Sequence, residues 1–259
     1  MVFNLILSVY NCIGSMKVNW NSVAKGQEKN LLLKQDFSQF LLSPVLTKKF
    51  STVHKLKRYP EVSDYQKEAI NGLMLSDGYA RGGRLGFTFK SMDLAFIRWL
   101  KFEVLGNLSS EVHPTPYPKE NPTQYWFGTR VNPYFDEIRA KWYMEKRKVL
   151  PQDFKMTPIA LAFLIMGDGY WENDSNTVFI STEKFPLEEI HRLIFSLRHD
   201  LDLTVTTKKR GENYRLRFSS RGKNLTLLRK LVQPYMHADM FYKLGLESGD
   251  KKGDQKITT

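Results

Sequence analysis

Cysteine is almost absent from this sequence, and its histidines follow no ordered pattern. The single thiol of Cys12 excludes an internal disulfide framework and a cysteine-rich zinc site, and it fits a reducing compartment. The histidines show no metal-ligand spacing, so we expect surface or packing roles for them. They are His54, His113, His191, His199 and His237.

Acidic residues are the second shortage. The 27 Asp and Glu residues are outnumbered by 39 Lys and Arg residues, which gives a formal net charge of +12. Such a charge repels basic partners and concentrates polyanions. Nucleic acid is therefore the expected partner, ahead of an anionic membrane.

The shortage of acid is greatest at the N-terminus, where only Glu28 and Asp36 precede Glu61. We expect a loosely folded basic extension over residues 1–60. The alternative is a mitochondrial import leader, although such leaders favour arginine and Arg58 is the only one in this stretch. The expected location is the mitochondrion or another organelle.

Long apolar runs are missing as well. The N-terminal stretch MVFNLILSVYNCIG is interrupted by Asn4 and Asn11, and it is shorter than the ~20 residues that a membrane-spanning helix needs. It also lacks the basic leader of a signal peptide. With 42% hydrophobic and 13% aromatic residues, the chain is expected to fold around a substantial core.

One phrase occurs twice, as AINGLMLSDGYA and ALAFLIMGDGYW, and its two aspartates are 168 − 77 = 91 residues apart. In both copies, apolar residues at i, i+3 and i+4 are followed by aspartate at i+7. The carboxylate therefore lies at the end of the apolar stripe of a helix. The two stripes are Ile70, Leu73, Met74 and Asp77, and Leu161, Leu164, Ile165 and Asp168.

An aspartate in the last turn of a helix faces the negative end of the helix dipole, which costs ~0.3–1 kcal/mol. Gly78 and Gly169 suit a helix end that tolerates positive φ, but they do not explain the acids. If the two stripes pack against each other, both carboxylates converge at one point. Hard oxygen ligands there suit Mg²⁺, so we predict a metal site at Asp77 and Asp168.

The segments around the two motifs also repeat. The first half is expected to contain strands over 84–91 and 125–130, helices over 93–106 and 133–148, and a proline-rich loop over 113–124. The second half is expected to contain a strand over 177–184, a helix over 187–201, a hairpin over 203–220 that turns near Gly211, and a helix over 223–236. This order predicts a structural repeat. We place the half-domains at 61–150 and 151–246, followed by a charged tail over 247–259.

The segments INGLMLSDG and LAFLIMGDG resemble the two motif helices of a LAGLIDADG homing endonuclease, in the single-chain form that organelle introns encode. The resemblance covers roughly residues 65–246. Leu75 and Met166 replace the first acidic position of the family motif, and Phe163 stands where the first copy has Gly72. Neither departure touches the acids predicted to bind metal, but both make the helix interface more apolar and less symmetric.

The resemblance implies an α+β fold of two pseudo-symmetric αββαββα halves, whose antiparallel sheets form a saddle over DNA. It implies a monomer in which Asp77 and Asp168 hold Mg²⁺, with Mn²⁺ able to substitute and Ca²⁺ supporting binding without efficient cleavage. Lys148 and Lys243 close the two halves, where similar enzymes carry a lysine beside the active site, and a solvated role is the alternative. The helix interface is expected at Gly72, Leu73, Phe163 and Leu164.

Strand residues that alternate with core residues are expected to contact DNA. Along 203–220, Leu216 and Phe218 point to the core, and Glu212 is the only acid between residues 203 and 230. Such a strand ladder can enter the major groove as a β-ribbon, and an ordinary solvated sheet face is the alternative. The expected DNA contacts are Arg81, Arg84, Thr88, Lys90, Arg130, Ser181, Thr204, Thr206, Lys208, Lys209, Arg210, Arg215, Arg217, Ser219 and Arg221.

These features predict a site-specific endonuclease that hydrolyses both strands of a long, asymmetric double-stranded DNA target with the help of metal ions. The alternative is an RNA-binding intron maturase that assists splicing, with or without residual DNA cleavage. A maturase or a transcription regulator of the same fold need not keep both acids, so the acids favour the nuclease. No membrane and no obligate protein partner are expected.

Overall fold

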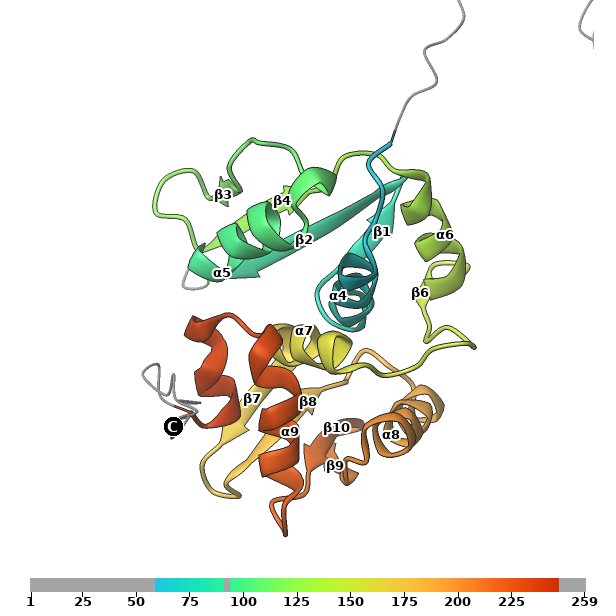
Figure 1. Cartoon of the computed structure of the whole chain (residues 1–259), viewed down its shortest axis with the longest axis vertical. Helices are drawn as coiled ribbons and strands as arrows, with labels where there is room; N and C mark the ends of the chain where they lie inside the picture. Colours follow the sequence, from blue (N-terminus) through green and yellow to red (C-terminus); the bar gives the residue numbers. More distant parts are fainter. Residues whose placement is uncertain (1–58, 91–93, 247–259) are drawn as a thin grey trace, which may run out of the picture. The chain divides into compact units, whose positions relative to one another are not determined.

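The structure repeats one order of elements twice (Figure 1). This computed structural model describes residues 59–90 and 94–246, so the expected tail and all but residues 59 and 60 of the N-terminal extension lie outside the described residues. The first half contains α4 (Asp64–Leu75), β1 (Tyr79–Arg81), β2 (Arg84–Lys90), α5 (Leu94–Trp99), β3 (Thr115–Tyr117), β4 (Gln124–Gly128) and α6 (Pro133–Trp142). The second contains α7 (Pro158–Asp168), β7 (Gly169–Glu172), β8 (Thr177–Ser181), α8 (Leu187–Leu201), β9 (Val205–Arg210), β10 (Asn213–Phe218) and α9 (Asn224–Val232).

Each half folds as one αββαββα unit around a four-stranded antiparallel sheet. The strand orders are β1-β2-β4-β3 and β7-β8-β10-β9, which correspond element by element. In β2, Leu85, Phe87 and Phe89 are buried and Thr88 is exposed, as the alternation predicted. The α+β class and the predicted repeat are thus both present in the fold.

The two motif helices lie side by side at the centre of the described residues, between the two sheets (Figure 1). Ser63 begins α4 with a reciprocal capping pair to Gln66, and Thr157 caps α7 with Pro158 in its first turn. Every residue of α7 from 160 to 166 is buried, which is typical of a helix in the middle of a core. None of the described helices is long and apolar enough to cross a membrane.

The helices approach each other through a row of small residues, and not through the stripes that the sequence suggested. A Cβ added to Gly72 would lie 2.2 Å from the backbone oxygen of Ala160, and one added to Gly167 would lie 2.4 Å from Ser76 Oγ. On a helix with about 100° per residue, this row lies roughly a third of a turn from the stripe through Ile70. The expectation that the stripes pack together is therefore wrong at the closest approach, because small residues let backbones come nearest.

Of the four residues expected at the helix interface, Gly72 and Phe163 meet directly. A Cβ on Gly72 would lie 2.7 Å from Phe163 Cβ. The Phe163 ring stacks on Trp99 with centroids 5.8 Å apart and meets the Tyr65 ring edge-on. Leu73 and Leu164 are buried in the same core. Because Phe163 replaces a small residue, its ring extends into the first half and ties the two halves together.

The helix expected over 133–148 ends early. Asn132 caps α6, but Tyr143 takes extended backbone and Glu145 takes a φ of 58°, which turns the chain into a hairpin. This hairpin pairs β5 (Tyr143–Met144) with β6 (Arg147–Lys148). Lys148 therefore lies on a short strand that returns towards the motif helices, and not at the end of a helix.

Three further differences concern short elements. The proline-rich loop contains β3, which pairs with β4, and strands β1 and β7 directly follow the motifs. The helix expected over 93–106 begins as α5, continues as a π-helix and ends in a 3-10 turn. In the second half, two 3-10 segments follow α9. These elements are η3 (Leu100–Val104), η4 (Gly106–Leu108), η5 (Gln233–Tyr235) and η6 (Ala238–Leu244). Period-based reasoning recognises long elements, whereas strands of three or four residues carry too few positions to show alternation.

Candidate active site and nucleic-acid interface

The ends of the two motif helices meet, and this brings the motif acids into one neighbourhood. Asp168 is the last residue of α7, and Asp77 follows α4 after the capping residue Ser76. Asp77 Oδ2 lies 3.9 Å from the position that a Cβ on Gly167 would take. The two motif acids therefore lie close together at the paired helix ends, and the charge of Asp77 acts on Asp168.

Asp168 is the more enclosed of the two acids. Its side chain is 13% exposed, and its buried Oδ2 forms an ion pair with Lys184 Nζ at 2.9 Å. Burial raises the pKa of Asp168, and the charge of Asp77 adds to the rise, while Lys184 and Lys243 oppose it. This oxygen already has a cationic partner, so the position favours positive charge.

Lys148 is anchored to the end of the first motif helix. Its Nζ donates to the backbone oxygens of Gly78 at 2.6 Å and Ser76 at 3.3 Å. Burial lowers the pKa of Lys148 to about 8, and the neighbouring charge of Lys184 acts in the same direction. The ammonium group offsets the negative end of the helix dipole beside Asp77.

Lys243, on η6, makes the equivalent contact in the second half. Its Nζ donates to the backbone oxygens of Met166 at 2.6 Å and Gly167 at 2.9 Å, at the end of the second motif helix. Each predicted lysine therefore contacts the residues next to the acid of its own half. Whether either lysine takes part in chemistry remains a prediction.

Lys184 is a third cation at this site, and the sequence reasoning missed it. It follows β8, and its Nζ reaches both Asp168 Oδ2 at 2.9 Å and the backbone oxygen of Ser76 at 2.8 Å. It thereby joins the ends of the two motif helices. Lys184 lies 184 − 168 = 16 residues after the motif acid, and only the pairing of β7 with β8 brings the chain back to the site.

The donor set fits a hard divalent cation. No cluster of three or more His, Cys, Asp or Glu side chains suited to a metal occurs in residues 59–90 and 94–246. Mg²⁺ is commonly held by one or two carboxylates, with waters and substrate phosphates completing its shell. Asp77 and Asp168 bring two carboxylates into one neighbourhood, which meets this requirement.

In the second sheet, most of the predicted DNA contacts share one face. Residues paired across antiparallel strands lie on the same face. Arg217 pairs with Phe179 and Thr206, and Arg215 pairs with Ser181 and Lys208. The same alternation places Arg210 on this face and Lys209 on the opposite one, where it pairs with Tyr214. Thr204, Ser219 and Arg221 lie just outside the strands.

The two arginines of β10 have different surroundings. Arg215 is 15% exposed, forms an ion pair and hydrogen bond with Glu183, and donates to Tyr170 Oη at 2.8 Å. Arg217 has a buried Nε without a hydrogen-bond partner. Arg215 is thus held by hydrogen bonds within the protein, whereas the Arg217 Nε has no such partner.

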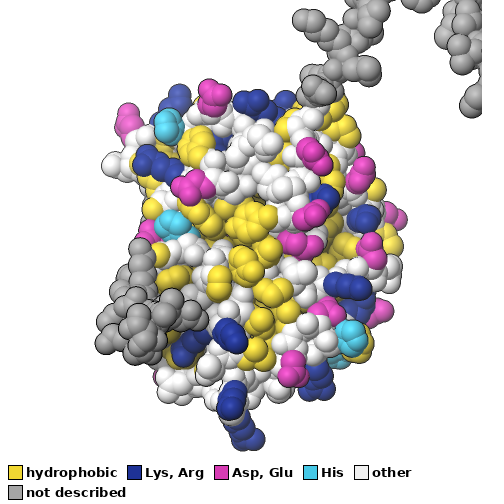
Figure 2. Space-filling view, viewed as in Figure 1, with side chains coloured by type: hydrophobic (Ala, Val, Ile, Leu, Met, Phe, Trp, Pro, Cys, Tyr) yellow, Lys and Arg dark blue, Asp and Glu magenta, His cyan; other side chains and the backbone are white. Residues whose placement is uncertain are grey.

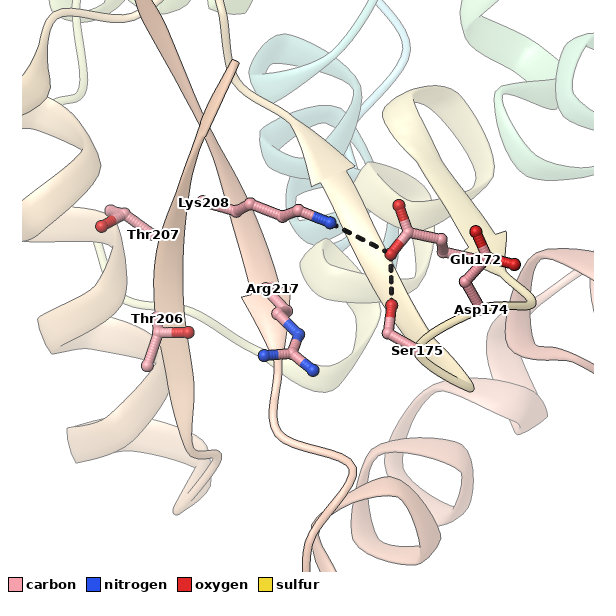
Figure 3. A pocket seen from close by; sticks show the side chains of 7 residues that line it. All are labelled: Glu172, Asp174, Ser175, Thr206, Thr207, Lys208 and Arg217. Carbon is pink, nitrogen blue, oxygen red and sulfur yellow. Dashed lines mark hydrogen bonds and ion pairs between the residues drawn. The ribbon is translucent and has the colours of Figure 1, made fainter.

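Arg217 points into a pocket on this face (Figure 3). The pocket has a volume of about 390 Å³ and does not include the motif acids. Lys208 and Ser175 both contact the Glu172 carboxylate at its edge (Figure 3). Its lining residues are Glu172, Asp174, Ser175, Thr206, Thr207, Lys208 and Arg217. Both signs of charge are present, which suits the mixed donors and acceptors of a base-pair edge.

The corresponding face of the first sheet carries the other predicted contacts. Arg81 pairs with Arg84, Thr88 with Trp126, and Lys90 with Gln124, while Arg130 follows β4. These cations are exposed. By contrast, the molecular face drawn in Figure 2 carries hydrophobic side chains across its middle with both signs of charge around them. Contact of the strand faces with DNA stays a prediction.

The chain belongs to the LAGLIDADG DNA endonuclease family, whose model matches residues 67–225. This confirms the resemblance found in the motifs. Over 213 residues it is 27% identical to the DNA endonuclease I-ChuI of Chlamydomonas applanata, covering 71% of this chain and 95% of that protein.

Two cytochrome b mRNA maturases bI2 are also similar. Identity is 31% over 121 residues for the Debaryomyces hansenii protein, covering 46% of this chain and 45% of that protein. It is 27% over 198 residues for the Saccharomyces cerevisiae protein, covering 68% of this chain and 46% of that protein. The chain thus spans about half the length of these maturases.

The fold is that of a solved family structure. The homing endonuclease I-WcaI bound to its DNA recognition sequence superposes with a TM-score of 0.64 at 21% identity, covering 86% of this chain and 95% of that one. The predicted α+β fold with two antiparallel sheets is thereby confirmed.

Proposed function

We propose that this protein is a homing endonuclease that cuts both strands of a long, asymmetric DNA target by metal-assisted hydrolysis. The observation that carries the proposal is the convergence of Asp77 and Asp168 at the paired ends of α4 and α7. A protein that only binds nucleic acid gains nothing from two adjacent carboxylates, which repel each other and repel phosphate.

Asp77 and Asp168 would hold divalent cations, Mg²⁺ in the cell, with Mn²⁺ as a substitute. When bound, such ions polarise the scissile phosphate and lower the pKa of the attacking water. Lys148 and Lys243 are fixed by backbone oxygens at the two helix ends, and their ammonium groups would stabilise the negative charge that develops during cleavage. Lys184 balances the charge of Asp168 and holds the two helix ends together.

The two sheets would contact the duplex on either side of this centre. One chain contains both motif acids, so a monomer supplies the complete site. The DNA endonuclease I-ChuI, of which this chain covers 95%, supports the nuclease activity, and the DNA-bound structure of I-WcaI supports the partner. The names of the cytochrome b mRNA maturases support an organelle as the location.

The test is a cleavage selection on double-stranded DNA containing a randomised site, with Mg²⁺ present and the cut ends sequenced. We expect one long target that is not a palindrome. Asp77→Asn and Asp168→Asn should abolish cleavage while keeping affinity for that target in Ca²⁺. Removal of Mg²⁺ from the wild type with EDTA should also abolish cleavage. Asp153→Asn is the matched control, because Asp153 is an exposed acid paired with Lys141. Wild-type rates in both motif variants contradict the proposal.

RNA maturation is the second candidate, and the two maturase relatives favour it. Its test is the splicing rate of the intron RNA that carries the reading frame, with and without the protein. Faster splicing in both Asn variants together with no DNA cleavage by the wild type replaces the nuclease with the maturase. Faster splicing alongside DNA cleavage by the wild type assigns both activities to one chain.

A further inference from the structure

Two aromatic rings lie close to a pair of glycines on the face of the first sheet that carries the predicted DNA contacts. A Cβ on Gly86 would lie 2.3 Å from the Tyr79 ring, and one on Gly128 would lie 3.4 Å from the Trp126 ring. Gly86 and Gly128 are direct partners across β2 and β4. Trp126 Nε1 donates to Tyr79 Oη at 3.0 Å, which joins the two rings. We call Tyr79 and Trp126 the aromatic platform.

The platform is open to solvent although it is rigidly built. Tyr79 is 41% exposed and Trp126 is 45% exposed. Glycine within a strand weakens it, and it is commonly found where another group approaches the backbone closely. Here the glycines make room for the platform's own rings. The two glycines therefore weaken the strands, and the exposed rings of Tyr79 and Trp126 form an apolar surface above them.

The second sheet treats the same positions differently. There the corresponding row is Tyr170, Phe179 and Arg217. Phe179 is fully buried, with Lys208 Nζ lying 4.9 Å from its ring centroid, and Arg215 lies 5.4 Å from the ring of Tyr170. Cations thus cover the rings of the second half, whereas the rings of the first half remain bare.

The surroundings of the platform indicate its occupant. Arg84, Thr88 and Lys90 are exposed on the same face, so the platform lies within a surface that attracts phosphates. In the major groove of duplex DNA, the apolar group that a base pair presents is the C5-methyl of thymine. We propose that the aromatic platform contacts thymine methyl groups, so that the first half reads A·T pairs while the second half reads polar base edges.

This inference rests on the proposed DNA-binding function, and its test separates the two. The selected target is remade with deoxyuridine in place of thymidine, one position at a time, which removes the methyl and keeps base pairing. Affinity is measured in Ca²⁺. We expect one or two positions, all in the half-site of the first sheet, to lose affinity about fourfold, the effect of burying one methylene-sized group. Thymines in the other half-site should tolerate the change.

Trp126→Thr should abolish this difference, binding the thymidine and deoxyuridine targets equally. The matched control is Tyr117→Thr, because Tyr117 is 65% exposed on the same face but pairs with Gln124 and is not part of the platform. It should keep the fourfold difference. Cleavage of the unmodified target reports on the proposed function, and a protein that cuts no DNA removes both claims. If it cuts but tolerates deoxyuridine everywhere, or if Trp126→Thr keeps the difference, the platform has another role.

Discussion

Adding one methyl group at the helix crossing should destabilise the protein by an amount that depends on what the methyl meets. In Gly72→Ala the new Cβ would start 2.2 Å from a backbone oxygen of Ala160. Ordinary contact needs ~3.5 Å, so the helices must separate by roughly 1 Å. Overpacking costs about 1–3 kcal/mol, offset by ~1 kcal/mol because alanine favours a helix more than glycine. The difference is a net loss of about 0–2 kcal/mol. We expect ~1–2 kcal/mol, the upper part of this range, because the new Cβ meets backbone that cannot rotate away.

Gly167→Ala meets a side chain, so its cost should be reversible. Its Cβ would start 2.4 Å from Ser76 Oγ and 2.5 Å from Ser76 Cβ. In the double variant Ser76→Gly with Gly167→Ala the obstructing atoms are absent, and we expect ~1–2 kcal/mol of favourable coupling. Ser76→Gly should leave most of the loss in Gly72→Ala, because the atom that Gly72→Ala meets belongs to the backbone.

The assay is thermal unfolding followed by circular dichroism, combined with single-turnover cleavage. For a chain of this size each kcal/mol shifts the unfolding temperature by ~2–4 °C, so Gly72→Ala should lower it by roughly 2–8 °C. Cleavage should fall in the same variant, because separating the helices separates the acids. An unchanged unfolding temperature in Gly72→Ala, or equal rescue of both alanine variants by Ser76→Gly, refutes the proposed small-residue contact.

Three further predictions concern the charged residues. Lys148→Ala and Lys243→Ala should slow cleavage more than they weaken affinity in Ca²⁺, since a contact that strengthens in the transition state changes the rate selectively; equal losses indicate phosphate contacts. Because the pKa of Lys148 is about 8, its charge is present below pH 8 and is lost above it. The cleavage rate of Lys148→Arg should therefore fall less than that of the wild type as pH rises past 8. Parallel pH profiles of the two proteins contradict this. Arg217→Ala should relax base discrimination at one position by ~1–3 kcal/mol. Arg215→Ala should mainly lower the unfolding temperature, because it removes the nearer cationic partner of Glu183 and the donor to Tyr170 Oη. A profile of single-base targets that is the same for both variants excludes this division.

Periodicity predicted the long elements well. The helix over 187–201 and the hairpin turning at Gly211, which has a φ of 59°, are where the sequence placed them. Residues of one element determine such patterns, so a single sequence is sufficient. The hairpin that follows the early end of α6 instead requires a positive φ at Glu145. Glutamate rarely adopts this conformation, so the sequence does not predict the turn.

The site was predictable in its acids and not in its surroundings. Repetition revealed Asp77 and Asp168, but Lys184 reaches Ser76 across 184 − 76 = 108 residues, and no local pattern encodes that distance. Hydrophobic stripes identify which residues are buried and not what they are buried against. The closest contacts between the helices lie at Gly72 and Gly167. Hydrophobic periodicity does not identify such positions, because glycine adds little to an apolar stripe.

The side chains that differ between the two sheets should make the two halves of the DNA target differ. The backbone of the two halves follows one topology, so a palindromic target would be expected if the side chains also matched. They do not match where ligands would bind. The row that holds Gly86 and Gly128 under bare rings in one half holds Phe179 and Arg217 in the other, with Lys208 above. Because affinity for each base depends on these side chains and not on the strands beneath them, one chain with this fold is suited to a target whose two sides differ.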